Sequence, residues 1–187
     1  MRDPHQRGGQ QSPPEASEPP ISATPSHFKG EGFPVESVSW EDVQVFLTRL
    51  NSRESAYSFR LPSEAEWEYA CHGGTKATDP KHLADEAWFK NNSGASTNPA
   101  GQKQPNRFGL YDMNGNVAEW VQDWYAPDYY TGSPRTDPKG PSTGSHRVFR
   151  GGAWLTEASL CRPTIRNFDF PKSRFYHVGF RLVRTAK

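Results

Sequence analysis

The core of this chain must be built largely from aromatic rings, and this constrains the fold more than any other feature. Aromatic residues are 13% of the sequence and include six Trp, whereas all hydrophobic residues together are 33%, below the usual share for a globular domain. From Thr75 to Thr143 the chain is rich in Gly, Asn, Pro, Asp and Ser and is only briefly periodic. Short strands, turns and long loops are therefore expected.

Length and charge narrow the class of protein. At 187 residues the chain has room for one domain and a tail. Basic residues (22) and acidic residues (21) nearly balance, so charge does not favour nucleic acid or an anionic membrane as the main partner. No apolar run approaches the roughly 20 residues that span a bilayer, and the first twenty residues lack the apolar stretch of a signal peptide. We expect no nucleic acid, no membrane and a cytoplasmic location.

The composition changes near residue 32. Residues 1–32 are rich in Pro, Gly, Ser, Gln and Glu, and their few apolar side chains cannot offset the entropy of ordering the segment. We therefore predict a disordered tail over 1–32 and one domain over 33–187.

Two helices are predicted from apolar spacing and capping signals. The first runs from about Trp40 to Leu50 behind an N-cap at Ser39, and the second begins with the capping box of Ser63 and Glu66. Short strands are expected at 57–61, 147–150 and 179–183. Trp120 and Trp124, one helical turn apart, are expected to fill the core.

Charged side chains within the predicted elements also have structural explanations. The carboxylates of Glu64, Glu66 and Glu68 would be scattered around a helix axis, so we interpret them as capping, dipole and solvent residues and not as an acid–base pair. Several arginines, including Arg150, Arg166, Arg174 and Arg181, cluster in the last third of the chain. They could bind ligand carboxylates or phosphates, or pair with acids of the fold itself.

Cysteine usage does not indicate a disulfide framework, although one bridge between the two cysteines is geometrically possible. The two thiols, Cys71 and Cys161, lie in segments that look like a helix and a loop. Cys161, in an aromatic and loop-rich setting, is interpreted as a small buried hydrophobe. Residual copper affinity through Cys161 and a neighbouring His146 or His177 is the alternative.

The turn between Asp112 and Glu119 is the best candidate metal site. Two carboxylates that frame a tight Asn/Gly-rich turn can supply side-chain oxygens to a hard cation such as calcium, and carbonyl oxygens between them can complete the shell. In the alternative, both carboxylates hydrogen-bond only their own turn.

An ordered series of motifs resembles the formylglycine-generating enzyme, or sulfatase-modifying factor, family. The matching segments are 34–42, 60–70, 109–120 (GLYDMNGNVAEW), 151–161 (GGAWLTEASLC) and 178–181 (VGFR). The resemblance implies a single irregular α+β domain, a variant of the C-type-lectin fold with two helices, short antiparallel strands and long loops. It also implies a structural calcium bound by Asp112, Gly115, Val117 and Glu119, the middle two through carbonyl oxygens.

The resemblance also implies a copper ion between two thiolates spaced five apart, and here the sequence departs from the family. Thr156 stands where the first of these cysteines belongs, so the family's copper centre cannot form, because Cu(I) selects sulfur over hydroxyl. Ala153 and Ala118 replace a serine and a tryptophan of active members. We therefore expect no copper and no catalytic residue, with Cys161 as the exception if a divergent oxidase acting on sulfatase cysteines is the correct alternative.

The same scaffold occurs in variable proteins of diversity-generating retroelements, which display changeable side chains near the C-terminus. The matching positions mix large rings with polar groups, as recognition surfaces do. They include Trp154, Thr156, Glu157, Phe168, Phe170, Phe175, Tyr176 and His177. We predict that this surface binds a protein or a small molecule. Family members ordinarily carry further strands before Pro34, so a partner that covers an open strand edge is also expected.

Overall fold

The computed structural model describes residues 22–73 and 82–187. Helices are α1 (Trp40–Arg53), α2 (Glu64–Cys71) and the one-turn α3 (Leu83–Glu86) and α4 (Tyr129–Gly132); a 3₁₀ turn covers Ala158–Leu160. Strands are β1 (Tyr57–Arg60), β2 (Ala118–Trp124), β3 (Arg147–Arg150), β4 (Arg166–Asp169), β5 (Val178–Phe180) and β6 (Val183–Ala186). The predicted α+β class with long loops is confirmed. Within the described ranges, no helix has the length and apolar character needed to cross a bilayer.

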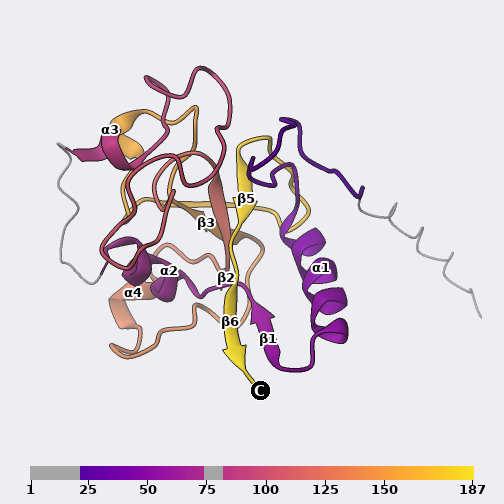
Figure 1. Ribbon diagram of the computed structural model, residues 1–187. Helices are drawn as coiled ribbons and strands as arrows, with labels where there is room; N and C mark the ends of the chain where they lie inside the picture. The colour runs from indigo at the N-terminus through magenta and orange to yellow at the C-terminus, as the bar shows by residue number, and fades with distance from the viewer. Residues whose placement is uncertain (1–21, 74–81) are drawn as a thin grey trace, which may run out of the picture.

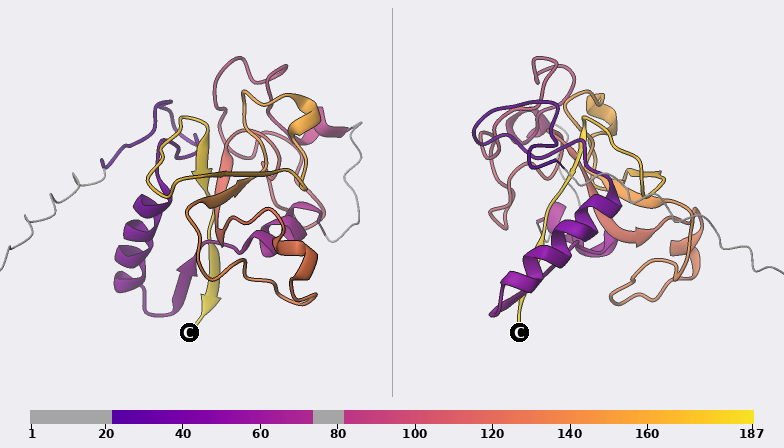
Figure 2. Two further views of the ribbon diagram at one scale, coloured as in Figure 1. Left: turned by 180° about the vertical axis from the view of Figure 1, so that it is seen from behind. Right: turned by 90° about the vertical axis from the view of Figure 1, so that its right-hand side faces the viewer.

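Two small sheets organise the chain. The larger has the strand order β4-β3-β2-β5, and the smaller pairs β1 with β6. Strands β2, β3 and β4 are antiparallel neighbours, but β5 runs parallel to β2, so the expectation of antiparallel strands was incomplete. The parallel pair arises because the loop after β4 carries the chain back before β5 begins. Figure 1 shows β1 and β6 extending below the larger sheet with α1 beside them, and the views in Figure 2 agree.

Helix α1 begins at the predicted N-cap. The Ser39 side chain accepts the Asp42 amide, and the Asp42 carboxylate accepts the Ser39 amide, so aspartate closes a box that usually contains Glu or Gln. Asp42 also holds Arg174 through two hydrogen bonds of 2.6 and 2.7 Å. The start of α1 is thus tied to the loop between β4 and β5.

Helix α2 also has its predicted capping box, but one of its glutamates was misjudged. Glu66 caps the helix with Ser63 as expected. Glu64 is not a solvent residue: it is 1% exposed and pairs with Arg150 and Arg166. The first turn of α2 faces strands β3 and β4, and these contacts cannot be seen in the periodicity of the helix.

Trp120 and Trp124 lie on a strand, not on a helix. β2 pairs with β3 on one side and β5 on the other, and a register irregularity separates the two rings. Trp120 is fully buried, whereas Trp124 packs one face of the Arg147 guanidinium, whose other face packs on Trp40. A strand covered on both faces loses the simple alternation of apolar and polar residues that identifies strands in a sequence.

The core combines aromatic and aliphatic side chains, so the prediction of a core built largely from rings is confirmed only in part. Trp67 and Trp120 are the largest fully buried side chains, but most of the buried hydrophobic residues are aliphatic. Trp120 packs with Val38, Leu61 and Val178, among others, and Trp67 belongs to a second cluster.

The single strand expected at 179–183 is interrupted at Arg181 and Leu182, which separate β5 from β6. The Arg181 side chain pairs with Glu119.

Candidate functional site

The glycine pair after β3 allows a close approach of three segments. Gly152 has φ +72°, and a Cβ there would lie 2.9 Å from the Cys161 Sγ. A Cβ on Gly151, at φ +98°, would lie 3.0 Å from both the Trp67 ring and the Met113 carbonyl oxygen. The glycine pair thus allows a close approach of these segments and positions Cys161.

Cys161 is a buried, free thiol. It is 3% exposed and lies in a cluster with Ala87 and Phe89. Burial raises the pKa of the Cys161 thiol to about 11, because the thiolate would lose its hydration there. The thiolate is the form that binds copper and acts as a nucleophile. At neutral pH this raised pKa keeps Cys161 as the neutral thiol, which is suited to neither role. Cys71 is also a free, buried thiol, and the absence of a disulfide was correctly predicted.

Thr156 has a structural role in place of the missing thiolate. Its Oγ1 accepts the Ala153 amide at 2.9 Å, and its carbonyl oxygen accepts the Lys90 amide at 3.0 Å. The Cys161 Sγ lies 4.0 Å from that same carbonyl oxygen. One thiol beside a hydroxyl that is already bonded does not fit a two-thiolate copper centre.

The two histidines considered as extra copper ligands pack against aromatic rings. His146 packs against Phe168 and Phe170, and His177 packs against Phe175 and Tyr176. Among the described residues, no three His, Cys, Asp or Glu side chains gather as a metal site.

The two carboxylates of the Asp112–Glu119 turn differ in their hydrogen-bond partners. Glu119 is buried and accepts the Trp67 indole N–H at 2.7 Å and two N–H groups of Arg181 at 2.5 and 2.6 Å. Asp112 has φ +53°; its Oδ2 accepts the Gly101 amide, and its Oδ1 is buried without a hydrogen-bond partner. Burial raises the pKa of Asp112 above its ordinary value.

These contacts sharpen the calcium prediction without testing it. The orphaned Oδ1 of Asp112 is a ready oxygen ligand, whereas Glu119 would have to exchange Arg181 for the ion. Gly115 has φ +79°, and a Cβ there would overlap the backbone of Trp88, so its place in the turn requires glycine. Asp112, Val117 and Glu119 line one open cavity of about 460 Å³. Calcium binding at the turn remains a prediction.

The residues predicted to bind a ligand fall into three places. Trp154, Phe175, Tyr176 and His177 share ring contacts at one end of the domain. Phe168, on the edge strand β4, forms a second group with Phe170, just after that strand, and with His146, just before β3. Thr156 and Glu157 lie near Lys90, which forms an ion pair with Glu157.

Only some of these residues are exposed enough to contact a ligand. The side chains of Phe168, Phe170 and Tyr176 are 42%, 58% and 49% exposed, and Trp154 is partly buried. Phe175 instead packs against the main hydrophobic core. Two rings that the sequence did not suggest, His27 and Phe28, join the Trp154 group. Their segment was assigned to the tail, and no periodicity marks it.

The clustered arginines serve the fold. Arg150, fully buried, pairs with Glu64 and Glu68 and donates to the Pro163 carbonyl oxygen. Arg166 makes a two-point contact with Glu64 at 2.6 and 2.9 Å. Together with Asp42–Arg174 and Glu119–Arg181, these pairs connect segments that are far apart in the chain, and the structural alternative for the arginines is confirmed.

Comparison with known proteins agrees with this architecture. The sulfatase-modifying factor enzyme 1-like domain family matches residues 7–186. The chain belongs to this family. A formylglycine-generating enzyme of Streptomyces coelicolor is 34% identical over 96% of this chain and 60% of its own length. The chain thus spans about three fifths of that relative.

Two solved structures of family-like scaffolds are similar to the described fold. Treponema denticola variable protein 1 has a TM-score of 0.79 and 34% identity, over 87% of this chain and 78% of its own. PvdO from Pseudomonas aeruginosa has a TM-score of 0.74 and 30% identity, over 84% of this chain and 64% of its own. The family scaffold is therefore compatible with different functions, and the site must decide between them.

Proposed function

We propose that this chain is a non-catalytic binding domain on the formylglycine-generating-enzyme scaffold. The observation that carries the proposal is the pair of residues at the expected copper centre. Thr156 offers a hydroxyl that already accepts the Ala153 amide, and Cys161 is a buried thiol whose pKa is raised to about 11. Neither side chain is prepared to bind a soft metal ion or to engage a substrate thiol.

The surface around Trp154 and Tyr176 is the proposed ligand site. Its rings are partly exposed and come from segments 22 positions apart, which the Trp154 indole N–H joins by donating to the Tyr176 carbonyl oxygen at 3.4 Å. Aromatic rings held on a stable scaffold are typical of binding hot spots. The similarity to Treponema denticola variable protein 1 supports a display role for such a scaffold.

A divergent oxidase is the second candidate function. The 34% identity to a formylglycine-generating enzyme favours it, and one of the two expected cysteines is present. If this alternative holds, Cys161 must become accessible and a different group must replace the missing thiolate.

An oxidation assay separates the two functions. The protein is incubated with Cu(I), oxygen, a thiol reductant that supplies the two further electrons, and a cysteine-containing sulfatase peptide, and formylglycine is measured by mass spectrometry. The matched variant is Thr156→Cys, which restores two thiols spaced five apart. We expect no formylglycine and no tight Cu(I) binding from the unmodified protein, and a gain of Cu(I) affinity in the variant. Formylglycine produced by the unmodified protein would overturn the proposed function.

A further inference from the structure

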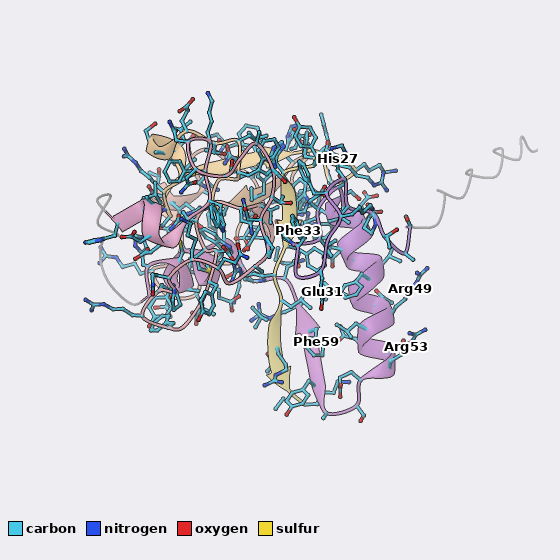
Figure 3. All side chains as sticks on the ribbon, turned by 45° about the horizontal axis from the view of Figure 1, so that its top comes forward. His27, Glu31, Phe33, Arg49, Arg53 and Phe59 are labelled. Atoms are coloured by element: carbon cyan, nitrogen blue, oxygen red, sulfur yellow. The ribbon has the colours of Figure 1, made fainter. Side chains whose placement is uncertain are left out.

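An arm formed by residues 22–33 lies against the domain and contributes to the proposed ligand site. The Phe28 amide donates to Glu36 Oε1 at 2.8 Å, and the Glu36 amide donates to the Ser26 hydroxyl at 3.2 Å. Farther along, the Ala100 amide donates to the Gly32 carbonyl oxygen at 2.8 Å. Figure 3 shows His27 near one end of α1, above Phe33. These bonds fix the arm where its two rings meet Trp154 and Tyr176.

Four rings form a closed cycle at this place. The ring centroids are separated by 4.8 Å for His27–Phe28, 5.5 Å for Phe28–Trp154, 5.8 Å for Trp154–Tyr176 and 5.9 Å for Tyr176–His27. The first two contacts are edge-to-face, with interplanar angles of 88°, and the other two are tilted. His27 and Tyr176 are exposed, and Phe28 and Trp154 are partly buried. Ring faces carry partial negative charge and attract cations within about 6 Å of the centroid.

A buried carboxylate, that of Glu36, accepts the backbone amide of Phe28, one residue of the cycle. Glu36 is 0% exposed, and its oxygens accept only the Phe28 amide and the Ser37 hydroxyl, the latter at 2.6 Å. Across residues 22–73 and 82–187, no Lys, Arg or His forms an ion pair with it. The nearest cation along the arm, Lys29, is exposed and donates to the Thr24 carbonyl oxygen. A carboxylate of this kind gives the cycle a negative potential that little solvent screens.

The chemistry of the cycle selects among cations. A primary ammonium needs three hydrogen-bond acceptors, yet the site presents mainly ring faces, and the Glu36 carboxylate is not accessible to a ligand. Removing such a group from water without new hydrogen bonds is costly. An ammonium whose four substituents are all carbon has no N–H group that needs an acceptor, so its transfer from water costs the least free energy. It also gains the attraction of the ring faces and of Glu36.

We propose that the cycle of His27, Phe28, Trp154 and Tyr176, backed by Glu36, binds an alkylated ammonium group of a small ligand. The inference rests on the proposed function, because it assigns a ligand class to the same surface. Residues 22–33 are then part of the binding site and not merely a leader to the domain.

Choline and its neutral isostere 3,3-dimethylbutan-1-ol provide the test, because they have nearly the same shape and differ in charge. Each is titrated into the full chain at constant ionic strength, and binding is followed by the NMR signal of the Trp154 indole N–H, assigned with Trp154→Phe. We expect choline to bind at least tenfold more tightly than the isostere. Acetylated trimethyllysine amide, as a third probe, distinguishes a free small molecule from a modified side chain as the source of the group.

Variants separate the rings from the charge. Tyr176→Leu keeps apolar area but removes a ring face, and it should weaken choline binding at least fivefold. Glu36→Gln keeps an acceptor for the Phe28 amide, and it should weaken choline about fivefold without affecting the isostere. Tyr69→Leu is the matched control, because Tyr69 is an exposed tyrosine on α2 whose ring packs against that of Phe108. Melting temperatures establish that each variant is folded.

The outcomes separate this inference from the proposed function. Equal binding of choline and the isostere at Trp154 would refute the cation site but support a binding surface. The same holds if Tyr176→Leu binds choline normally. No binding of any probe would refute the cation site, and the proposed function would then depend on the oxidation assay alone.

Discussion

Two carboxylates of this protein, Glu64 and Glu36, are buried to the same degree in opposite surroundings. Glu64, on α2, is paired with the guanidinium groups of Arg150 and Arg166. Glu36, beside the arm, has only a backbone amide and a hydroxyl as donors. A buried carboxylate that is paired with arginines holds distant parts of the fold together. A buried carboxylate with only neutral donors has a negative potential that no ion pair cancels, so it can attract another cation.

The remaining buried acids follow the same division. Glu119 is paired with Arg181, and Asp42 with Arg174. Asp112 and Asp123 each have a buried oxygen without a hydrogen-bond partner. The paired acids connect distant segments of the core. Asp112 lies in a turn and Asp123 lies on β2. Among the described residues neither forms an ion pair, although Arg181 and Arg166 lie close enough to oppose the rise that burial causes in the pKa values of Asp112 and Asp123, respectively. Removing either charge should therefore affect the unfolding free energy differently from removing the charge of a paired acid.

The largest expected effect is the loss of a paired charge. Glu64→Gln leaves Arg150, which is fully buried, and Arg166 without their shared carboxylate, and it should cost about 3–5 kcal/mol of unfolding free energy. Urea denaturation measures this loss. The matched control on the same helix is Glu66→Gln, whose ion pair with Arg60 is partly exposed and whose capping bond glutamine can replace, so it should cost less than about 1 kcal/mol. Equal losses in the two variants would contradict the division.

The next effect concerns pH and an acid without an ion pair. Burial raises the pKa of Asp123 from its ordinary value of 3.8 to about 6. Because the folded pKa lies above the unfolded one, the contribution of Asp123 is complete below about pH 4 and is lost as the pH rises through 6, by up to about 3 kcal/mol. Asp123→Asn keeps an acceptor for the Glu64 amide and should remove this loss.

Denaturation of both proteins at several values between pH 4 and pH 7 gives the difference curve. Taking the difference cancels groups that titrate in both proteins, such as Glu66, whose pKa Arg60 lowers to about 2. Stability curves that stay parallel across this range would show that Asp123 is not destabilised by burial.

Calcium at Asp112 would give a somewhat smaller effect. Calcium at one hundred times its Kd should stabilise the fold by about 2.7 kcal/mol, so a chelator should lower the melting temperature. Asp112→Asn should remove that response, because it removes the charge beside the orphaned oxygen. Glu119→Ala is a poor test, since it leaves Arg181 without its partner whether or not calcium binds. A melting temperature unaffected by both calcium and chelator would refute the calcium site.

The parts of the fold that could be predicted from the sequence are those stabilised by contacts between residues only a few positions apart. Ser39 with Asp42 and Ser63 with Glu66 cap their helices locally, and both helices were predicted. The role of Glu64 was missed because Arg150 and Arg166 are 86 and 102 positions away. β2 was missed because its burial depends on two partner strands, which local periodicity cannot show.

The candidate site was predictable only where a motif marks it. The spacing of Thr156 and Cys161 relative to the glycine pair is the signal from which an altered copper centre is predicted. The rings of His27 and Phe28 were not predictable, because their segment has the composition of a tail. The arm is held by two hydrogen bonds with Glu36, whose side chain accepts the Phe28 amide and whose amide donates to the Ser26 hydroxyl. Glu36 lies in a motif segment, but its contacts with the arm cannot be deduced from the sequence.

The smallest expected effect tests the comparison most directly. Glu36→Gln keeps an oxygen for the Phe28 amide and a polar group near the Ser37 hydroxyl, so it should change the unfolding free energy by no more than about 1 kcal/mol. Glu64→Gln, at nearly the same burial, should cost several times more. Urea denaturation of the two variants side by side gives the ratio. A loss at Glu36 as large as that at Glu64 would mean that the fold itself needs the negative charge, and Glu36 would then not be free to act on a bound cation.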